Sequence, residues 1–247
     1  MIKGLYTSAL GLSVLNKQQE VTANNLANAQ TVGYKKDVLV AESFPEMLHY
    51  RLNAPEDCGQ TPPKVGAVSL GVKINDIFID HSVGIRRTSE NPLALALVEE
   101  GYFTVNTPQG ERYTRKGDFT LDDQGRIVSA EGYPLLGQKG EIVVQGSDVQ
   151  VDQQGRIFNG GTEIDRLKIV NVSTPLIKEG SSLFQGENPQ EIVNPIIVQG
   201  AVEESNVQPI TEMVNMITTL RAYEANQKVI QSIDNTLDKA VNEVGRL

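Results

Sequence analysis

The chain has 247 residues, of which 39% are hydrophobic, so it is long enough to bury one or two cores and is predicted to be globular. Its 31 acidic and 22 basic residues give a formal net charge of −9. This acidic balance argues against nucleic acid or an anionic membrane as the main partner, because both attract basic surfaces.

Few residues are suited to a disulfide, a metal site or a membrane span. Cys58 is the only cysteine, and the two histidines, His49 and His81, stand in unrelated contexts. No His, Cys, Asp or Glu grouping has the spacing of a metal site, so we predict neither metal nor cofactor. No apolar run approaches the roughly 20 residues that cross a bilayer, and residues 1–30 do not read as a cleavable signal. Taken alone, these features favour the cytoplasm and no membrane insertion.

The first segment, from Ile2 to about Gln30, is predicted to be a helix because it contains no proline and repeats at spacings of three and four. Its only charged residues are Lys3, Lys17 and Glu20, which are few for a helix with a solvated outer face. We therefore expect that face to be covered in the working state. The repeat consists of Ile2, Leu5, Ala9, Leu12, Asn16, Gln19, Ala23 and Leu26.

Residues 34–79 are predicted to be a connector. They contain a short apolar and polar stretch from Phe44 to Leu52, followed by a loop rich in proline and glycine. That loop holds Pro55, Gly59, Pro62 and Pro63.

Residues 80–205 have the short β-type runs and Gly-rich turns of an all-β body. Pro108 and Gly110 occupy turn positions that predict a hairpin between residues 102–105 and 112–114. The segment 121–127 recurs as 151–157, each copy with Asp at the start and Gly at the end of a reverse turn, which predicts two similar hairpins. Segments 166–172 and 192–198 are further strand candidates, and Pro195 favours an edge for the second.

The aspartates of the body could be interpreted as calcium ligands or as catalytic acids. Neither turn has the alternating ligands and closing glutamate of a calcium loop, so turn formation explains Asp122 and Asp152 better. With Asp118 and Asp123 they are also the candidate carboxylates of an enzyme. No nucleophile, base and orienting group can be assembled around them, so we predict no enzymatic activity.

The last segment is predicted to be a second long helix that begins at Pro209, a residue suited to a first helical turn. Ser205 and Asn206 just upstream are possible caps. About 35 residues at ~1.5 Å each would extend roughly 50 Å. Its apolar positions are Ile210, Met213, Ile217, Leu220, Tyr223, Ile230, Ile233, Leu237, Ala240 and Val244, mostly three and four apart.

Together these elements predict an α+β fold in which N- and C-terminal helices form a coiled-coil stalk around a central all-β domain. The predicted domains are residues 1–33 with 206–247 for the helices, 34–79 for the connector and 80–205 for the β body. Pattern alone leaves open a compact α+β domain with both helices packed on the β body.

Amides gather at the end of the first helix, at Asn24, Asn25, Asn28 and Gln30. They could form hydrogen bonds between helices of neighbouring copies and fix their register. Asn28 and Gln30 could equally mark a helix terminus with Gly33 as its left-handed cap.

Three groups of motifs resemble the flagellar rod and hook axial proteins over nearly the whole chain. The first is Asn24-Asn25-Leu26-Ala27-Asn28-Ala29 followed by Thr31-x-Gly33-Tyr34-Lys35. The second comprises residues 91–97, Gly101-Tyr102-Phe103 and Tyr113-Thr114-Arg115-x-Gly117-Asp118-Phe119. The third is Gly200-Ala201-Val202-Glu203-x-Ser205-Asn206-Val207, with Met216-Ile217-x-x-x-Arg221-x-Tyr223-Glu224-x-Asn226 after it.

The resemblance implies a structural subunit of the bacterial flagellar basal-body rod. Such a chain is exported unfolded through the flagellar type III apparatus and polymerises by its terminal helices into a hollow drive shaft in the cell envelope or periplasm. Its partners would be other copies and other rod and hook proteins. The assembly interface that this implies comprises Ile2, Leu5, Leu12, Asn24, Asn25, Leu26, Asn28, Ile210, Met213, Ile217, Leu220, Tyr223, Ile230, Ile233 and Leu237.

The short connector and single β insert favour a proximal rod type, with the distal rod type next. A hook-type axial protein is an alternative within the family, although hook proteins usually carry extra outer domains. A secreted β-headed binding module on a coiled-coil stalk is an alternative outside it.

Overall fold

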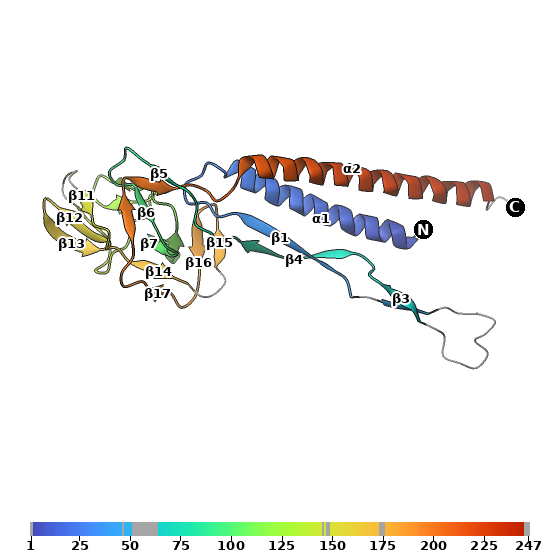
Figure 1. The fold of residues 1–247 in the computed structure, drawn as a ribbon, viewed down its shortest axis with the longest axis horizontal. Coiled ribbons are helices and arrows are strands. Elements are labelled where there is room, and N and C mark those ends of the chain that lie inside the picture. Colours follow the sequence, from blue (N-terminus) through green and yellow to red (C-terminus); the bar gives the residue numbers. More distant parts are fainter. Residues whose placement is uncertain are drawn as a thin grey trace. The chain divides into compact units, whose positions relative to one another are not determined.

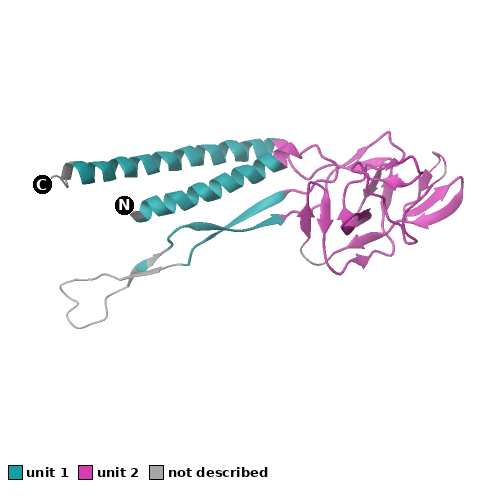
Figure 2. Cartoon of the chain, turned by 180° about the vertical axis from the view of Figure 1, so that it is seen from behind, with its two compact units in different colours: residues 1–24, 37–78, 210–247 teal, residues 25–36, 79–209 magenta. Residues whose placement is uncertain are grey.

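The computed structural model describes residues 2–45, 47–50, 64–144, 146, 149–172 and 176–244. They form two compact units, shown in two colours in Figure 2. The first unit, here the helical unit, contains Met1–Asn24, Asp37–Phe78 and Ile210–Leu247. The second unit, here the β body, contains Asn25–Lys36 and Ile79–Pro209. The fold is α+β, as predicted.

The helical unit contains two long helices, α1 (Ile2–Ala27) and α2 (Pro209–Lys239), and a π-helical turn η1 (Ala240–Val244) follows α2. Both helices were predicted, although α1 ends before Gln30. Proline at the first position of α2 loses no helical hydrogen bond, and Glu212 in the first turn complements the helix dipole. Asn206 does not cap α2, because its side chain bonds Lys36 and Asp80 instead.

The two helices run side by side in opposite directions (Figure 1). Asn226 Nδ2 donates to the carbonyl of Ser8 over 3.2 Å. A Cβ added at Gly11 would lie 2.8 Å from that same nitrogen, and one added at Gly4 would lie 3.5 Å from Ile233. Small residues on α1 therefore admit side chains of α2.

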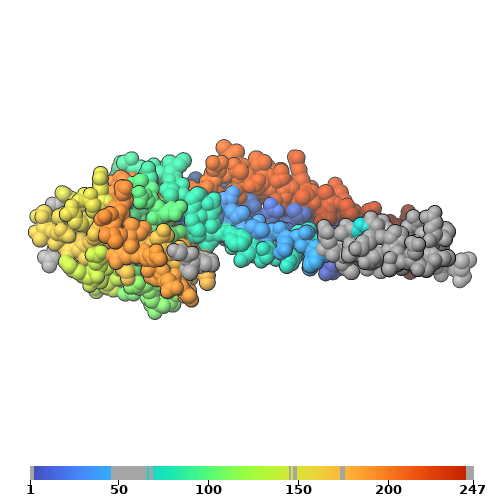
Figure 3. Space-filling model, turned by 60° about the horizontal axis from the view of Figure 1, so that its bottom comes forward, coloured from blue at the N-terminus to red at the C-terminus, as the bar shows by residue number. Residues whose placement is uncertain are grey.

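A β ribbon completes the helical unit where the sequence predicted only a connector. Strands β1 (Asp37–Ser43) and β4 (Val72–Ile79) pair with each other, and β2 (Met47–Tyr50) pairs antiparallel with β3 (Lys64–Val68). Thr7 donates to the carbonyl of Leu70, which connects the ribbon to α1. In Figure 3 the spheres of β1 (light blue) and β4 (cyan) lie at the surface of this unit. The predicted loop with Cys58 and the prolines lies outside the described residues.

The β body is built from short strands. A six-stranded sheet has the order β15-β16-β8-β7-β14-β17, and a three-stranded sheet has the order β11-β12-β13. The pairs β9–β10, β6–β18 and β5–β19 complete it. The strands are β5 (Arg86–Thr88), β6 (Leu95–Leu97), β7 (Tyr102–Thr107), β8 (Gly110–Thr114), β9 (Thr120–Leu121), β10 (Ile127–Val128), β11 (Val149–Val151), β12 (Arg156–Asn159), β13 (Thr162–Arg166), β14 (Ile169–Asn171), β15 (Ile177–Glu179), β16 (Leu183–Gln185), β17 (Gln190–Glu191), β18 (Ile197–Gln199) and β19 (Ala201–Glu203).

The hairpins predicted from turn residues are confirmed. Strands β7 and β8 pair from Phe103↔Thr114 to Thr107↔Gly110 around the expected turn. The two repeats form the hairpins β9–β10 and β11–β12. In each repeat the glycine has φ of 77° and donates to the aspartate carbonyl. A left-handed glycine is what closes these turns.

The later strand candidates are confirmed only in part. Within 166–172, strand β13 ends at Arg166 and β14 covers Ile169–Asn171. Within 192–198, only the end is strand, in β18 from Ile197, because Pro195 has no amide hydrogen for a ladder.

The core of the β body has two hydrophobic clusters on the two faces of β7. Phe103 and Val105 belong to the larger cluster, with Phe119, Leu135 and Ile157 fully buried beside them. Tyr102 belongs to the smaller one, with Tyr113 and Phe184. Alternation along one strand therefore fills both sides of the sheet.

Candidate functional site

One face of α2 exposes a row of apolar side chains, here called the α2 stripe. The exposed fraction of each residue in the row lies between 43% and 79%. Such exposure is unusual for a contiguous apolar row on one helix. Each residue turns a helix by about 100°, so all members lie within about 60° of Ile217. The stripe consists of Ile210, Met213, Val214, Ile217 and Leu220.

The rest of the apolar seam of α2 lies on another face. Tyr223, Ile230, Ile233 and Leu237 are half-buried, in line with Asn226, which contacts α1. The single seam predicted for α2 is therefore two seams. The steps from Ile217 to Leu220 and from Leu220 to Tyr223 are both three residues, and two such steps in succession rotate the apolar face about the helix.

The predicted interface residues of α1 have mixed environments. Leu5, Leu12, Leu26 and Asn28 are half-buried, and Asn24 is exposed. Asn25 is only 1% exposed, and its Oδ1 accepts a hydrogen bond from the Tyr34 hydroxyl over 3.1 Å. Because this side chain bonds within its own chain, it is not available to a neighbouring subunit. The side chain of Ile2 lies outside the described residues.

Three charged side chains meet in the interior of the β body. Glu203 accepts from Lys35 Nζ at 2.6 Å and from Arg115 Nε at 2.5 Å, and each side chain is at most 2% exposed. Glu203 Oε1 also accepts from the Gly84 amide. Lys35 donates to the carbonyl of Ser82 at 2.7 Å. Burial lowers the pKa of Lys35, and the nearby Glu203 carboxylate opposes that shift.

Close backbone contacts bring the segments of this charge cluster together. Gly33 has φ of 66°, and an added Cβ would lie 2.5 Å from the Lys116 nitrogen. Its amide donates to the Glu203 carbonyl over 2.8 Å. Gly33 therefore caps no helix, contrary to one reading of the sequence, since α1 ends at Ala27 and Gly33 packs against the β body.

Two of the carboxylates considered for catalysis, Asp122 and Asp152, are held in separate turns. Asp122 accepts from the amides of Gln124 and Arg126, and Arg126 Nε reaches its other oxygen over 2.8 Å. Asp152 is paired with Arg156 over 2.6 Å. These hydrogen bonds lower the pKa of both aspartates. Burial instead raises the pKa of Asp118. Among the described residues, no group of three or more His, Cys, Asp or Glu could hold a metal ion.

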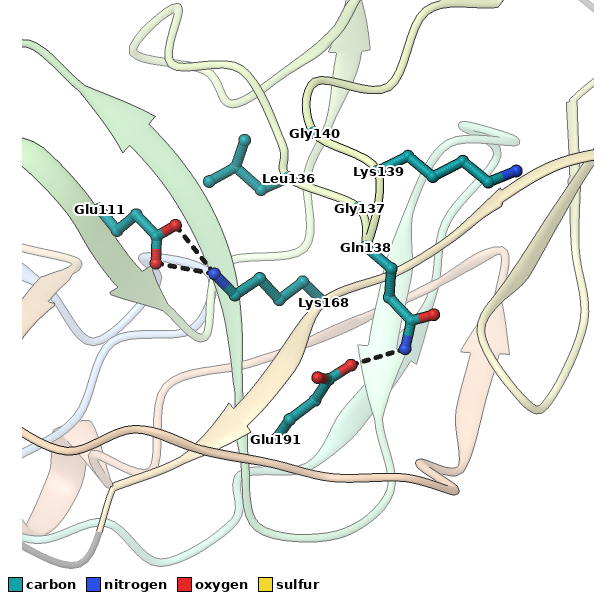
Figure 4. Close-up of a pocket in the computed structure, with 8 residues that line it drawn as sticks. All are labelled: Glu111, Leu136, Gly137, Gln138, Lys139, Gly140, Lys168 and Glu191. Atoms are coloured by element: carbon teal, nitrogen blue, oxygen red, sulfur yellow. Dashed lines mark hydrogen bonds and ion pairs between the residues drawn. The ribbon is translucent and has the colours of Figure 1, made fainter.

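The β body also has a polar cavity of about 680 Å³ (Figure 4). Lys168 pairs with Glu111 at 2.8 Å, and Gln138 donates to Glu191 at 2.6 Å. The described lining carries two acidic and two basic residues, so its formal charges sum to zero, and it contains no hydroxyl, thiol or imidazole nucleophile. The lining residues are Glu111, Leu136, Gly137, Gln138, Lys139, Gly140, Lys168 and Glu191.

Comparisons with known proteins match this chain in three places, the same regions in which the motifs occur. Residues 5–35 match the family model "Flagella basal body rod protein". Residues 96–159 match "Flagellar hook protein FlgE/F/G D1 domain", and residues 198–243 match "Flagellar basal body rod FlgEFG protein C-terminal".

Several relatives match over nearly their whole length. The flagellar basal-body rod protein FlgF of Caulobacter vibrioides is 30% identical over all of this chain and 98% of its own. The rod protein FlgG of Borreliella burgdorferi is 30% identical over 98% of each chain. The chain belongs to the flagellar basal-body rod protein family. The flagellar hook-basal body complex protein FlhO of Bacillus subtilis is also similar, at 27% identity over the full length of both chains.

This rod protein is therefore a structural subunit of the flagellar basal body, in a family that is structural and not enzymatic. Other rod and hook proteins are the partners that the family suggests. Relatives named FlgF and FlgG match at the same identity, so the proximal, FlgF-like type stays a prediction. No helix in the described part of the chain is long and apolar enough to cross a membrane.

The rod protein's family motifs meet in the charge cluster of the β body. Lys35 comes from the first motif, Arg115 from the second and Glu203 from the third. Sequence reasoning quoted these residues as a signature but assigned them no structural role. The signal that could have revealed it is a charged residue in each motif, since buried charges are found in pairs.

Proposed function

We propose that this rod protein polymerises through its terminal helices, with the α2 stripe as the surface that a neighbouring subunit covers. The observation that carries the proposal is the exposure of Ile210, Met213, Ile217 and Leu220 on one helix face. Burying each such side chain contributes about 1.5–3 kcal/mol, so a single chain leaves a substantial driving force unused.

The face that bears the stripe changes character further along α2. Arg221, Glu224 and Lys228 continue the same face and are exposed. Apolar side chains supply affinity in a helical interface, while charged side chains beside them select register and partner. This sequence of apolar and then charged residues fits packing against another helix at a fixed register.

The half-buried seam from Tyr223 to Leu237 would serve a different role within the same assembly. It lies on the face of α2 that contacts α1, so we assign it to the pairing of the two helices in each subunit. The coiled-coil stalk would be this helix pair, and the stripe would join one stalk to the next. Leu5, Leu12 and Leu26 of α1 would support the pairing.

Membership of the flagellar basal-body rod family supports a proposal for the location and route of the chain. We propose that the chain works in the periplasmic part of the cell envelope and reaches it through the flagellar type III export apparatus.

An Ile217→Asp substitution tests the stripe directly. In a free chain the new carboxylate would stay in water, whereas in an assembly it would be buried without a partner in every copy. We expect an unchanged melting transition of the purified variant, together with cells that build no filament and do not swim. Basal-body micrographs and motility assays measure the second part.

Thr218→Asp is the matched control, because Thr218 is exposed and lies one residue further, about 100° around α2. Cells with this variant should swim. The assembly proposal fails if Ile217→Asp cells swim normally, or if that variant lowers the melting temperature of the β body by many degrees.

A further inference from the structure

The chain passes between its two units four times, at residues 24/25, 36/37, 78/79 and 209/210. Three of these passages begin or end in a ring of hydrogen bonds inside the β body. The Lys36 amide donates to Asn206 Oδ1, the Asp80 amide donates to the Lys36 carbonyl, and Asn206 Nδ2 donates to the Asp80 carbonyl, each over 2.8 Å. Segments far apart in the sequence are thus held at one place.

The fourth passage is attached to the same place. Asn25 accepts the hydrogen bond from Tyr34, the residue before Lys35. The Lys178 ammonium lies 3.8 Å from the centre of the Tyr34 ring and donates to the Lys35 carbonyl. Residues 25–36 are therefore bonded at several points to the rest of the body.

The buried charges stand directly beside this ring. Lys35 precedes Lys36, and Glu203 lies three residues before Asn206. A buried ion cluster adds little net stability compared with apolar side chains of the same size, but it fixes which groups must meet. The ion cluster lies beside these passages of the chain, so we assign it a role in holding the passages together.

We propose that Lys35, Lys36, Asp80, Arg115, Glu203 and Asn206 form a mechanical clamp that holds the passages between the units together. A load on the helical unit reaches the β body through these passages, because the chain has no other covalent route. The clamp distributes that load over several segments, so that no single segment is detached from the β body before the others. This role goes beyond polymerisation and does not depend on the α2 stripe.

The charges predict which substitutions open the clamp. Lys35→Met removes one of two cations and leaves Arg115 paired with Glu203, so the body stays folded while the first segment loses its anchor. Glu203→Gln leaves two buried cations facing each other and disrupts the whole site. Asn206→Ala breaks the hydrogen-bond ring without changing any buried charge.

Constant-force measurements on the full chain test the clamp, with handles on cysteines at the exposed positions 23 and 218 in a Cys58→Ser background. We expect the lifetime before the first extension to fall at least tenfold in Lys35→Met and in Asn206→Ala. Lys168→Met is the control, because Lys168 forms an ion pair with Glu111 elsewhere on the body, and its lifetime should match the parent.

Amide exchange separates fastening from general stability. In Asn206→Ala the Gly33 and Lys36 amides should exchange at least tenfold faster than in the parent, while the Phe103 amide in the core keeps its rate. Unchanged lifetimes in both clamp variants would overturn the proposal. So would equal acceleration at Gly33, Lys36 and Phe103, which would show only a weaker body.

Discussion

The two units differ in where most of their apolar residues lie. The β body encloses Phe103, Phe119 and Phe184 at 0% exposure, whereas the helical unit leaves Ile210 at 79%. The ribbon resembles α2 in this respect, since Val38, Ile74 and Phe78 are all more than one-third exposed. The body also exposes Ile85 at 76% and Val193 at 70%, but it encloses a hydrophobic core, whereas the apolar side chains of the α2 stripe form a contiguous exposed row on one helix.

Two glycines, one in each unit, differ in the space around them. In the body, a Cβ at Gly117 would lie 1.7 Å from the Leu95 carbonyl oxygen, so two backbone segments touch there. In α1, a Cβ at Gly4 would lie 3.5 Å from Ile233, an ordinary contact. The Gly117 position therefore tolerates no added atom, whereas the Gly4 position has room for one.

The largest expected effect comes from replacing one glycine in each unit with alanine. Gly117→Ala forces two backbone segments apart, so we expect the body to lose about 4 kcal/mol or more and to fail to fold at elevated temperature. Gly4→Ala favours the helix by up to about 1 kcal/mol and should fold normally. Chemical denaturation followed by near-UV absorbance measures both; equal stability of the two variants would contradict the comparison.

A smaller effect concerns the pH dependence of the body alone. Burial raises the pKa of Tyr102 to about 12 from an ordinary value of 10.0. The protonated phenol is therefore favoured in the folded state, so its contribution is complete below pH 10 and is lost as the pH rises towards 12. That loss amounts to about 2 kcal/mol.

Tyr102→Phe is the matched variant, since it cannot ionise. The stability advantage of the parent over this variant should shrink between pH 10 and 12, as measured by denaturation at a series of pH values. Parallel curves would show that Tyr102 is not buried as described.

The smallest effect concerns the two repeated turns. Asp122→Ala combined with Asp152→Ala removes hydrogen bonds that lower the pKa of both aspartates, but the turn glycines remain. We expect a small fall in melting temperature and normal motility. A calcium-dependent thermal shift in the parent that the double variant lacks would instead revive a metal site.

Local signals predicted much of the fold. Three-four spacing and Pro209 gave both helices, and turn residues gave the hairpins β7–β8, β9–β10 and β11–β12, because these depend on residues close in sequence. The pairing of β1 with β4 was missed, since both strands are largely exposed and lack the alternation that marks a half-buried strand. Their pairing also joins segments about thirty residues apart.

The candidate sites were predicted less completely. The residues of the stripe were named except Val214, but their separation from the Tyr223 seam depends on a change of helical phase that counting apolar positions overlooked. The clamp joins Lys35 to Glu203 across 168 residues, so no local pattern could have placed them together.

Chemical labelling of one stripe position tests the central claim most directly. In a Cys58→Ser background, Ile217→Cys should react rapidly with a maleimide in the purified chain and should be protected in isolated basal bodies. Maleimide labelling of Thr218→Cys, measured in parallel, shows whether protection differs between the stripe and the neighbouring face of α2. Strong protection of position 217 only after assembly is the result expected. Equal labelling of position 217 in the free chain and in basal bodies would show that no neighbour covers the stripe.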